Sequence, residues 1–128
     1  QAGWNVGGMT VLEVTTTGRK SGKDRTVFLT SPIQEGTSML VVGSRGGDDR
    51  HPDWFLNMKE KPEVKVNAKD NPDQSMMARI ATNEERDRLW PLVVEKYSGY
   101  GEYREKTERE IPLIWLDPIG GSADDGIE

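Results

Sequence analysis

The segment Thr15–Arg25, which reads Thr-Thr-Thr-Gly-Arg-Lys-Ser-Gly-Lys-Asp-Arg, constrains this chain more than any other stretch. β-Branched residues dominate Val11–Thr17, and strand-forming residues resume over Arg25–Ile33, so the glycines between them predict a turn that joins two strands. The turn carries four cations within seven residues, although the net charge of the chain is -5; they are Arg19, Lys20, Lys23 and Arg25. Positive charge is therefore concentrated at one tight turn.

This basic turn, residues 18–25, is suited to an anionic ligand. Its glycines permit a positive φ, which lets successive N–H groups converge on an anion, and arginine adds forked donors for phosphate or carboxylate. A solvated hairpin turn explains the same composition equally well, so both interpretations stay open at this point. A P-loop is excluded, because only three residues separate Gly18 from Gly22 and Asp24 follows Lys23. A Rossmann fingerprint is absent as well.

The composition indicates one domain with no specialisation for nucleic acid. A chain of 128 residues with 34% apolar and 30% charged side chains can build a single core. The absence of cysteine excludes disulfides and cysteine nucleophiles, and a single histidine excludes a histidine-rich metal centre, so we predict no metal site. The acidic balance argues against a nucleic-acid partner. No apolar run is long enough for a membrane span, and the absence of cysteine fits a cytoplasmic location.

Six strands are predicted, and the fold is expected to be mainly β with short helices. The second and third strands should form a hairpin, and the polar turn Lys69–Asp73 should join the fourth and fifth. Because helices do not alternate strictly with strands, an antiparallel barrel or sheet is favoured over a βαβ fold. The six segments are Val11–Thr17, Arg25–Ile33, Ser38–Gly43, Val64–Val66, Ser75–Ala81 and Ile111–Leu116.

Capping signals delimit two of the helices. Pro52 and Asp53 suit the first turn of a short helix that ends at Lys59–Lys61, just before Pro62. Core packing is expected for one face of this helix, which carries Trp54, Phe55 and Met58.

The second helix should begin with a capping box formed by Thr82 and Glu85 and should end near Tyr97. Pro91 predicts a kink or a broken turn within it. Its apolar stripe is expected to contain Leu89, Val93 and Tyr97.

Two further segments carry candidate site residues. Ser44–Arg50 is a second loop of glycine and arginine, which either faces the same anion as the basic turn or is an ordinary turn. Three tyrosines at three-residue spacing, Tyr97, Tyr100 and Tyr103, would lie near one face of a helical turn, where they line a site or simply pack. Two cationic loops with an aromatic group fit a flat ring that bears a long anionic tail. His51 is interpreted as a helix-entry cap or an exposed residue rather than a catalytic base.

The order of these motifs resembles the deazaflavin-dependent nitroreductase family of actinobacteria. The resemblance covers residues 10–118 and departs from the family pattern at Asp24, Arg45, Phe55 and Ser98. The matching motifs are Thr15–Gly22 with Arg25, Ser44–Gly47, His51-Pro52-x-Trp54-x-x-Asn57, Trp90-Pro91, Tyr97-x-x-Tyr100-x-x-Tyr103 and Arg109-x-Ile111-Pro112.

What the resemblance implies is a split β-barrel of the FMN-binding-protein type, an α+β fold with about six antiparallel strands. It implies reduced coenzyme F420, an 8-hydroxy-5-deazaflavin with a phosphodiester and an oligoglutamate tail, as the cofactor. The implied activity is that of an F420H2-dependent oxidoreductase. Such an enzyme transfers hydride to a small electrophilic molecule, namely a quinone, a nitroaromatic or the activated C=C bond of a lactone or enone.

The resemblance also assigns roles to residues of this chain. Tyr97, Tyr100 and Tyr103 correspond to tyrosines of the acceptor pocket, and Tyr100 is the first choice as proton donor. The cofactor-binding positions are Arg19, Lys20, Ser21, Arg25, Ser44, Arg45, Gly46, Trp54 and Asn57.

The chain is expected to divide into three segments. Residues 1–9 are expected to be a flexible N-terminal remnant, residues 10–118 the deazaflavin-binding barrel and residues 119–128 a disordered acidic tail. The sequence begins without methionine, and a peripheral membrane contact through missing N-terminal residues stays open. A non-catalytic carrier of F420 or FMN on the same barrel is the main alternative function. A protein-interaction module would require the correlated motifs to be coincidental.

Overall fold

The computed structural model describes residues 5–6, 9–44, 51–68, 71–106 and 110–119, which form a mainly β protein with short helices. The strands are β1 (Asn5–Val6), β2 (Met9–Thr17), β3 (Asp24–Ser31), β4 (Ile33–Glu35), β5 (Ser38–Val42), β6 (Glu63–Ala68), β7 (Asn71–Ile80) and β8 (Leu113–Pro118). The helices are α1 (Asp53–Glu60), α2 (Asn83–Lys96) and α3 (Gly99–Lys106).

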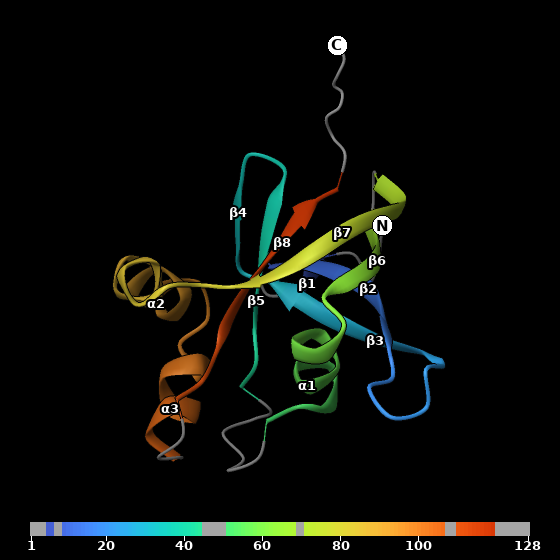
Figure 1. Ribbon diagram of the computed structural model, residues 1–128. Helices are drawn as coiled ribbons and strands as arrows, with labels where there is room; N and C mark the ends of the chain where they lie inside the picture. The colour runs from blue at the N-terminus through green and yellow to red at the C-terminus, as the bar shows by residue number, and fades with distance from the viewer. Residues whose placement is uncertain (1–4, 7–8, 45–50, 69–70, 107–109, 120–128) are drawn as a thin grey trace.

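All of these strands belong to one antiparallel sheet (Figure 1). The sheet runs in the order β1-β2-β6-β7-β8-β5-β4, and β3 joins it by pairing with β2. The β2–β3 register matches Thr10 with Ser31 and Thr17 with Asp24, so these strands form a long hairpin. The basic turn closes this hairpin and therefore lies at one end of the sheet.

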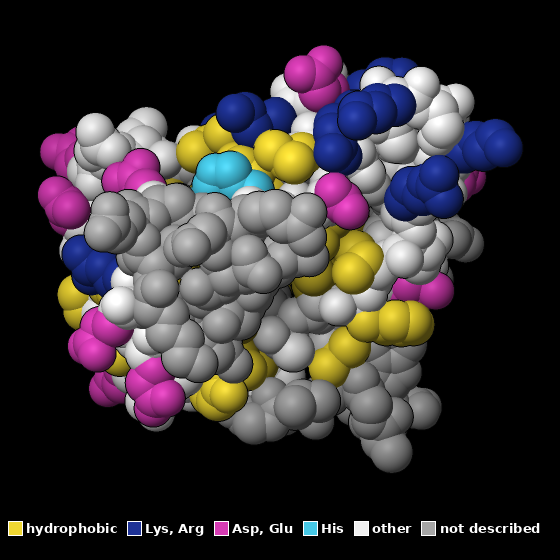
Figure 2. All heavy atoms as spheres, turned by 90° about the horizontal axis from the view of Figure 1, so that it is seen from below, with side chains coloured by type: hydrophobic (Ala, Val, Ile, Leu, Met, Phe, Trp, Pro, Cys, Tyr) yellow, Lys and Arg dark blue, Asp and Glu magenta, His cyan; other side chains and the backbone are white. Residues whose placement is uncertain are grey.

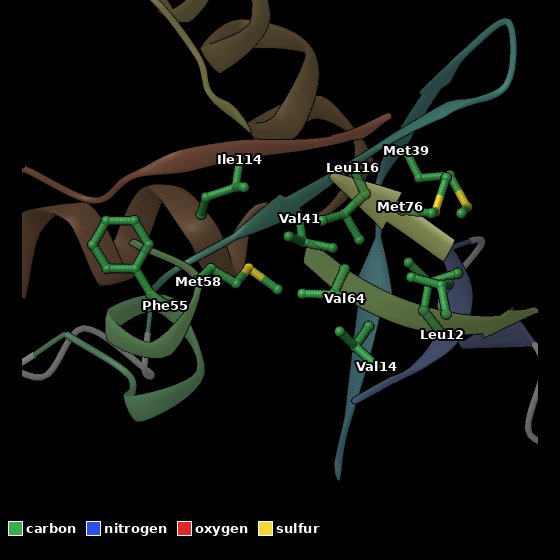
Figure 3. Packing of buried hydrophobic residues seen from close by; sticks show 11 residues of the cluster. Leu12, Val14, Met39, Val41, Phe55, Met58, Val64, Met76, Ile114 and Leu116 are labelled. Atoms are coloured by element: carbon green, nitrogen blue, oxygen red, sulfur yellow. The ribbon is translucent and has the colours of Figure 1, made fainter. Parts of the chain in front are cut away.

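Two clusters of buried side chains occupy opposite faces of the sheet. Val41 and Ile114 belong to the first cluster, whereas their neighbours Leu40 and Trp115 belong to the second, as the alternation of side chains along a strand requires. The first cluster draws side chains from β2, β5, β6, β7, β8 and α1 (Figure 3), so the sheet wraps around it as a half-barrel. Side chains of α2 and α3 cover the second cluster.

The hairpin predicted between the second and third strand segments is mostly wrong. Asp24–Ser31 pairs with β2, and of the predicted second segment only the part in the short strand β4 pairs with β5, through Ile33 and Leu40. Pro32 separates β3 from β4 because it has no N–H to donate to the ladder, and Gln34 instead bonds locally to the carbonyl oxygen of Ser31 at 2.9 Å. One long predicted strand is therefore two.

Two other boundaries differ from the prediction. β7 begins at Asn71, which pairs with Ala68, so the turn predicted over Lys69–Asp73 is shorter than expected. β1 pairs Asn5 with Thr10 and Val6 with Met9, so ordered strand residues occur within the expected N-terminal remnant. The expected acidic tail, except for Ile119, lies outside the described residues. The division into domains stays a prediction.

The first helix forms where its caps predict it. Pro52 occupies the N-cap position of α1, Asp53 lies in its first turn and Lys61 is its C-cap. Phe55 and Met58 are buried in the first cluster, and Trp54 packs against it while remaining partly exposed. This orientation of α1 leaves its first turn free to line a site at the end of the barrel.

The second helix confirms the predicted capping box but not the whole predicted stripe. The Thr82 hydroxyl accepts from the Glu85 N–H at 3.2 Å, and the Glu85 carboxylate accepts from the Thr82 N–H at 2.9 Å. Leu89 and Val93 are fully buried, but Tyr97 is 41% exposed because the helix ends at Lys96 and Tyr97 adopts an extended conformation as its C-cap.

Helix α2 is continuous through Pro91, which excludes a broken turn, one of the two predicted outcomes, and leaves the kink a prediction. Because proline has no N–H, it leaves the carbonyl four residues earlier in the helix without its usual donor. In α2 this is the carbonyl of Asp87. Both Pro91 and Asp87 are exposed, so water can bond to this carbonyl.

We expect Thr82→Ala to lower the free energy of unfolding by about 1 kcal/mol, because it removes the hydroxyl that accepts from the Glu85 N–H at the start of α2. Urea denaturation followed by circular dichroism measures this loss. Thr37→Ala, in the exposed turn between β4 and β5, is the matched control. Equal stabilities of the two variants would contradict the capping role.

Candidate functional site

The basic turn is closed by its own glycines. The Gly18 N–H donates to the Lys23 carbonyl at 2.8 Å, and the Gly22 N–H donates to the Gly18 carbonyl at 2.9 Å. Gly22 has a φ of +74°, and a Cβ on Gly18 would lie 2.7 Å from the Ser21 hydroxyl oxygen. The N–H groups of the two glycines themselves close the turn and are therefore not available to an anion.

Other N–H groups of the turn remain available to a ligand. The Ser21 hydroxyl accepts from the Lys23 N–H at 3.1 Å, which tightens the turn further. Within the described part of the chain, the N–H groups of Lys20 and Ser21 have no hydrogen-bond acceptor. Donors at the tip of the turn therefore accompany the cationic side chains.

Asn57 joins helix α1 to the basic turn. Its side-chain oxygen accepts from the Arg19 N–H at 3.1 Å and from Arg19 Nη1 at 2.8 Å. Its side-chain nitrogen donates to the Thr16 hydroxyl at 3.2 Å, and that hydroxyl is 3.3 Å from the Arg25 carbonyl oxygen. Asn57 is only 4% exposed, so these bonds are protected from water. The amide fixes both the turn and the guanidinium of Arg19.

Arg19 also meets the first turn of α1. Its Nη2 lies 3.4 Å from a carboxylate oxygen of Asp53, and its Nη1 lies 3.5 Å from the Asp53 carbonyl oxygen. In contrast, the side chains of Lys20 and Arg25 form no ion pair with any residue that the structure describes. Of the three cations of the turn that line the pocket, Arg19 is thus held by the protein, whereas Lys20 and Arg25 are available to an anion.

A pocket of about 650 Å³ lies between the basic turn, β3 and the start of α1. Lys and Arg side chains gather on one side of this end of the molecule (Figure 2). The apolar part of the lining comes from Val27, Pro52 and Trp54, and the polar part from the turn and α1. The complete lining is Thr16, Gly18, Arg19, Lys20, Ser21, Arg25, Thr26, Val27, Pro52, Asp53, Trp54 and Asn57. We call this the cationic pocket.

The structure brings six of the nine expected cofactor-binding residues to this pocket, namely Arg19, Lys20, Ser21, Arg25, Trp54 and Asn57. Ser44 is buried just after the end of β5 and is not among the lining residues. Arg45 and Gly46 lie outside the described residues, as does most of the second glycine and arginine loop.

Several lining residues were not predicted from the sequence. Asp53 was interpreted only as a helix-start signal, and Val27 and Thr26 only as strand residues. Spacing could have identified Asp53 as a pocket residue. It follows the N-cap proline directly and lies four residues before Asn57, so Asp53 and Asn57 share one side of α1. Nothing in the sequence distinguishes Val27 from the other apolar residues of β3.

Two of the three expected catalytic tyrosines, Tyr97 and Tyr100, lie at a different place from the cationic pocket. Tyr100 is 6% exposed within the second cluster, and its hydroxyl is 3.1 Å from the Thr30 hydroxyl and 3.8 Å from Met9 Sδ. The Tyr97 ring contacts the Tyr100 ring edge-on, with centroids 5.2 Å apart. Neither lines the cationic pocket. The side chain of Tyr103 lies outside the described part of the chain.

Burial determines the protonation of Tyr100. Desolvation raises the pKa of its hydroxyl above the ordinary value of 10.0, and the hydrogen bond with Thr30 offsets part of this rise. At neutral pH the hydroxyl therefore keeps its proton, so it can donate a hydrogen bond or a proton as well as accept a hydrogen bond.

His51 lies beside the pocket but packs against Phe55, with ring centroids 4.9 Å apart. It precedes the N-cap Pro52 and is partly exposed. Among the described residues, no group of three or more His, Cys, Asp or Glu side chains could hold a metal ion. No described helix combines the length and apolarity that crossing a membrane requires.

An antiparallel half-barrel with a cationic pocket at one end defines a class of small cofactor-binding barrels. A family model described as F420H(2)-dependent quinone reductase matches residues 1–118, and the chain belongs to this family. An F420H(2)-dependent quinone reductase of Mycobacterium tuberculosis is 36% identical over 105 residues, covering 79% of this chain and 68% of the relative.

Solved structures agree with this assignment. An F420-H2 dependent reductase (FDR-A) superimposes with a TM-score of 0.72 at 42% identity, covering 84% of this chain and 93% of the other. A putative pyridoxamine 5'-phosphate oxidase from Listeria innocua has a TM-score of 0.58 at 12% identity, covering 85% and 83%, and shows the fold alone. The predicted split β-barrel is confirmed. The chain is an F420H2-dependent oxidoreductase whose cofactor is reduced coenzyme F420.

Asn57→Ala should lower the free energy of unfolding by about 2 kcal/mol, because it leaves the Arg19 N–H without its acceptor in a buried position. Asn57→Asp retains an oxygen that accepts from Arg19 and should lose less. Chemical denaturation of both variants measures the difference. Equal losses would show that the Arg19 contacts do not stabilise the turn.

Stability should fall as pH rises above about 10, and Tyr100→Phe should lessen this fall. Above the ordinary pKa the unfolded chain releases the Tyr100 proton while the folded chain retains it, so ionisation favours unfolding. Below that pH both states hold the proton, and the group adds no pH dependence. Unfolding free energies at about pH 9 and about pH 11 test this, and identical falls in both proteins would contradict a buried hydroxyl.

Proposed function

We propose that this chain reduces a small electrophilic acceptor with the cationic pocket holding the anionic tail of reduced F420. The observation that carries the proposal is the grouping of Lys20, Arg25 and the tip of the turn in one pocket of a chain whose net charge is -5. A phosphodiester and an oligoglutamate tail present several negative charges. Charge-assisted hydrogen bonds to lysine and arginine are about twice as strong as neutral ones.

The residues present fit this group. Lys20 and Arg25 supply cations without competing partners in the described structure, and Lys20 and Ser21 add N–H donors. The first N–H groups of α1 border the same pocket, where the positive end of a helix favours an anion. Trp54 and Val27 provide an apolar wall that a flat ring system can contact. Ser44, Arg45 and Gly46 stay predicted contacts of the second loop.

When bound, reduced F420 supplies a hydride, and the protein supplies placement and a dry environment. The acceptor class we propose is a quinone, with nitroaromatics and activated C=C bonds of lactones and enones as further members. Reduction of such acceptors builds negative charge on oxygen, which a protonated hydroxyl can stabilise or protonate. Tyr100 keeps its proton at neutral pH, and the more exposed Tyr97 lies against it. Tyr97, Tyr100 and Tyr103 therefore stay proposed acceptor-side residues.

The direct test mixes purified protein with reduced F420 and menadione and follows the absorbance of the reduced coenzyme. We expect rapid loss of absorbance that depends on both protein and acceptor. Fluorescence titrations with F420 and FMN distinguish the reductase from a carrier. Tight F420 binding without turnover of any acceptor would favour the carrier, and FMN binding without F420 binding would overturn the cofactor assignment. A cytoplasmic location and a peripheral membrane contact stay predictions.

Lys20→Ala combined with Arg25→Ala should weaken F420 binding about tenfold or more at low salt, since each charge-assisted bond contributes about 1.5–3 kcal/mol when desolvated and less when exposed. The salt dependence of binding should decrease as well, because fewer ions are exchanged. Lys61→Ala combined with Lys65→Ala changes the net charge equally on another face and is the control. Equal weakening by both pairs would contradict local recognition of the tail.

A further inference from the structure

Asp53 is an unexpected residue in a pocket for a polyanion. Of the described residues that line the cationic pocket, it alone is acidic. Its carboxylate lies 3.4 Å from Arg19 Nη2, and its side chain is 88% exposed whereas that of Arg19 is 25% exposed. A negative charge therefore faces the space in which the proposed tail would lie, next to one of the cations.

The carboxylate is not needed to place Arg19. Asn57 already holds both the backbone N–H and Nη1 of Arg19, at 3.1 and 2.8 Å, and it does so from a buried position. The contact with Asp53 is longer and is open to water, and exposed ion pairs of this kind stabilise folds little. The contribution of Asp53 to the fold is thus small, while its charge, although screened by water, still adds negative potential to the pocket.

Asp53 reduces the positive potential of the pocket in two ways. Its carboxylate partly neutralises Arg19, and it lies in the first turn of α1, where it also offsets the positive end of the helix dipole. A bound polyanion must either displace this contact or accept repulsion from a like charge. Both effects oppose binding more strongly as the ligand carries more negative charge.

On the basis of the proposed function, we propose that Asp53 is a specificity-determining residue that competes with the anionic tail for Arg19 and limits coenzyme affinity. The proposed reaction oxidises the coenzyme once per turnover, so each turnover needs the spent molecule to leave. The carboxylate of Asp53 pairs with Arg19 when the tail leaves, which favours replacement of the oxidised coenzyme by a reduced one. It also makes affinity depend on the number of negative charges in the tail.

Asp53→Asn tests the proposal, because asparagine keeps the size of the side chain and removes its charge. We expect the dissociation constant for F420, measured by fluorescence at low salt, to fall about two- to fivefold, because a single exposed charge changes a binding free energy only slightly. The gain should grow with the number of glutamates in the tail and shrink in high salt.

Two further variants make the result decisive. Glu95→Gln, on the exposed side of α2, changes the net charge equally and should leave the dissociation constant at the wild-type value. Asp53→Glu keeps the charge and should bind like the wild type. If the wild type binds F420 and Asp53→Asn matches Glu95→Gln or binds more weakly, the proposal is overturned. If the wild type does not bind F420 at all, the proposed function fails instead.

Discussion

The side-chain amide of Asn57 is the interaction on which the site depends. It uses its oxygen for two donors of Arg19 and its nitrogen for the hydroxyl of Thr16, and it does so from a buried position on α1. Because both ends of the amide are used, its orientation is fixed by its partners. One residue thus holds a hairpin turn and a helix together although 38 residues separate Arg19 from Asn57. Without this link, the turn would be an ordinary charged loop.

Rigid attachment of the turn changes what its charges can do. The glycines and Ser21 use their own groups to close the turn, so its conformation exists before a ligand arrives. Lys20 and Arg25 then present charge from a fixed base, which reduces the entropy lost on binding. In a chain with a net charge of -5, such a local positive region also steers anions toward the pocket.

The fold separates this pocket from the tyrosines. The pocket lies where β2, β3 and α1 meet, next to the first cluster, whereas Tyr100 packs in the second cluster with Met9 and the side chains of α2. Strand β3 connects the two places, because Thr26 lines the pocket and Thr30 bonds to Tyr100. The proposed coenzyme pocket and the proposed acceptor side therefore share strand β3.

Local signals in the sequence predicted much of the fold and part of the site. The turn at Gly18–Gly22 and the capping box at Thr82 follow from residue type and spacing, which act over a few residues. The pairing of β3 with β2 instead of β5, and the supporting role of Asn57, depend on contacts between distant segments. The exposed position of Tyr97 depends on where α2 ends. Periodicity alone did not locate that end closely enough.

A crystal structure of the complex with oxidised F420 tests the central claim most directly. The account predicts the phosphodiester or the first glutamates between the basic turn and α1, within hydrogen-bond distance of Lys20 and Arg25, with the Asn57–Arg19 bonds unchanged. A tail bound on the side of α2 and α3, with Lys20 and Arg25 facing only solvent, would contradict it.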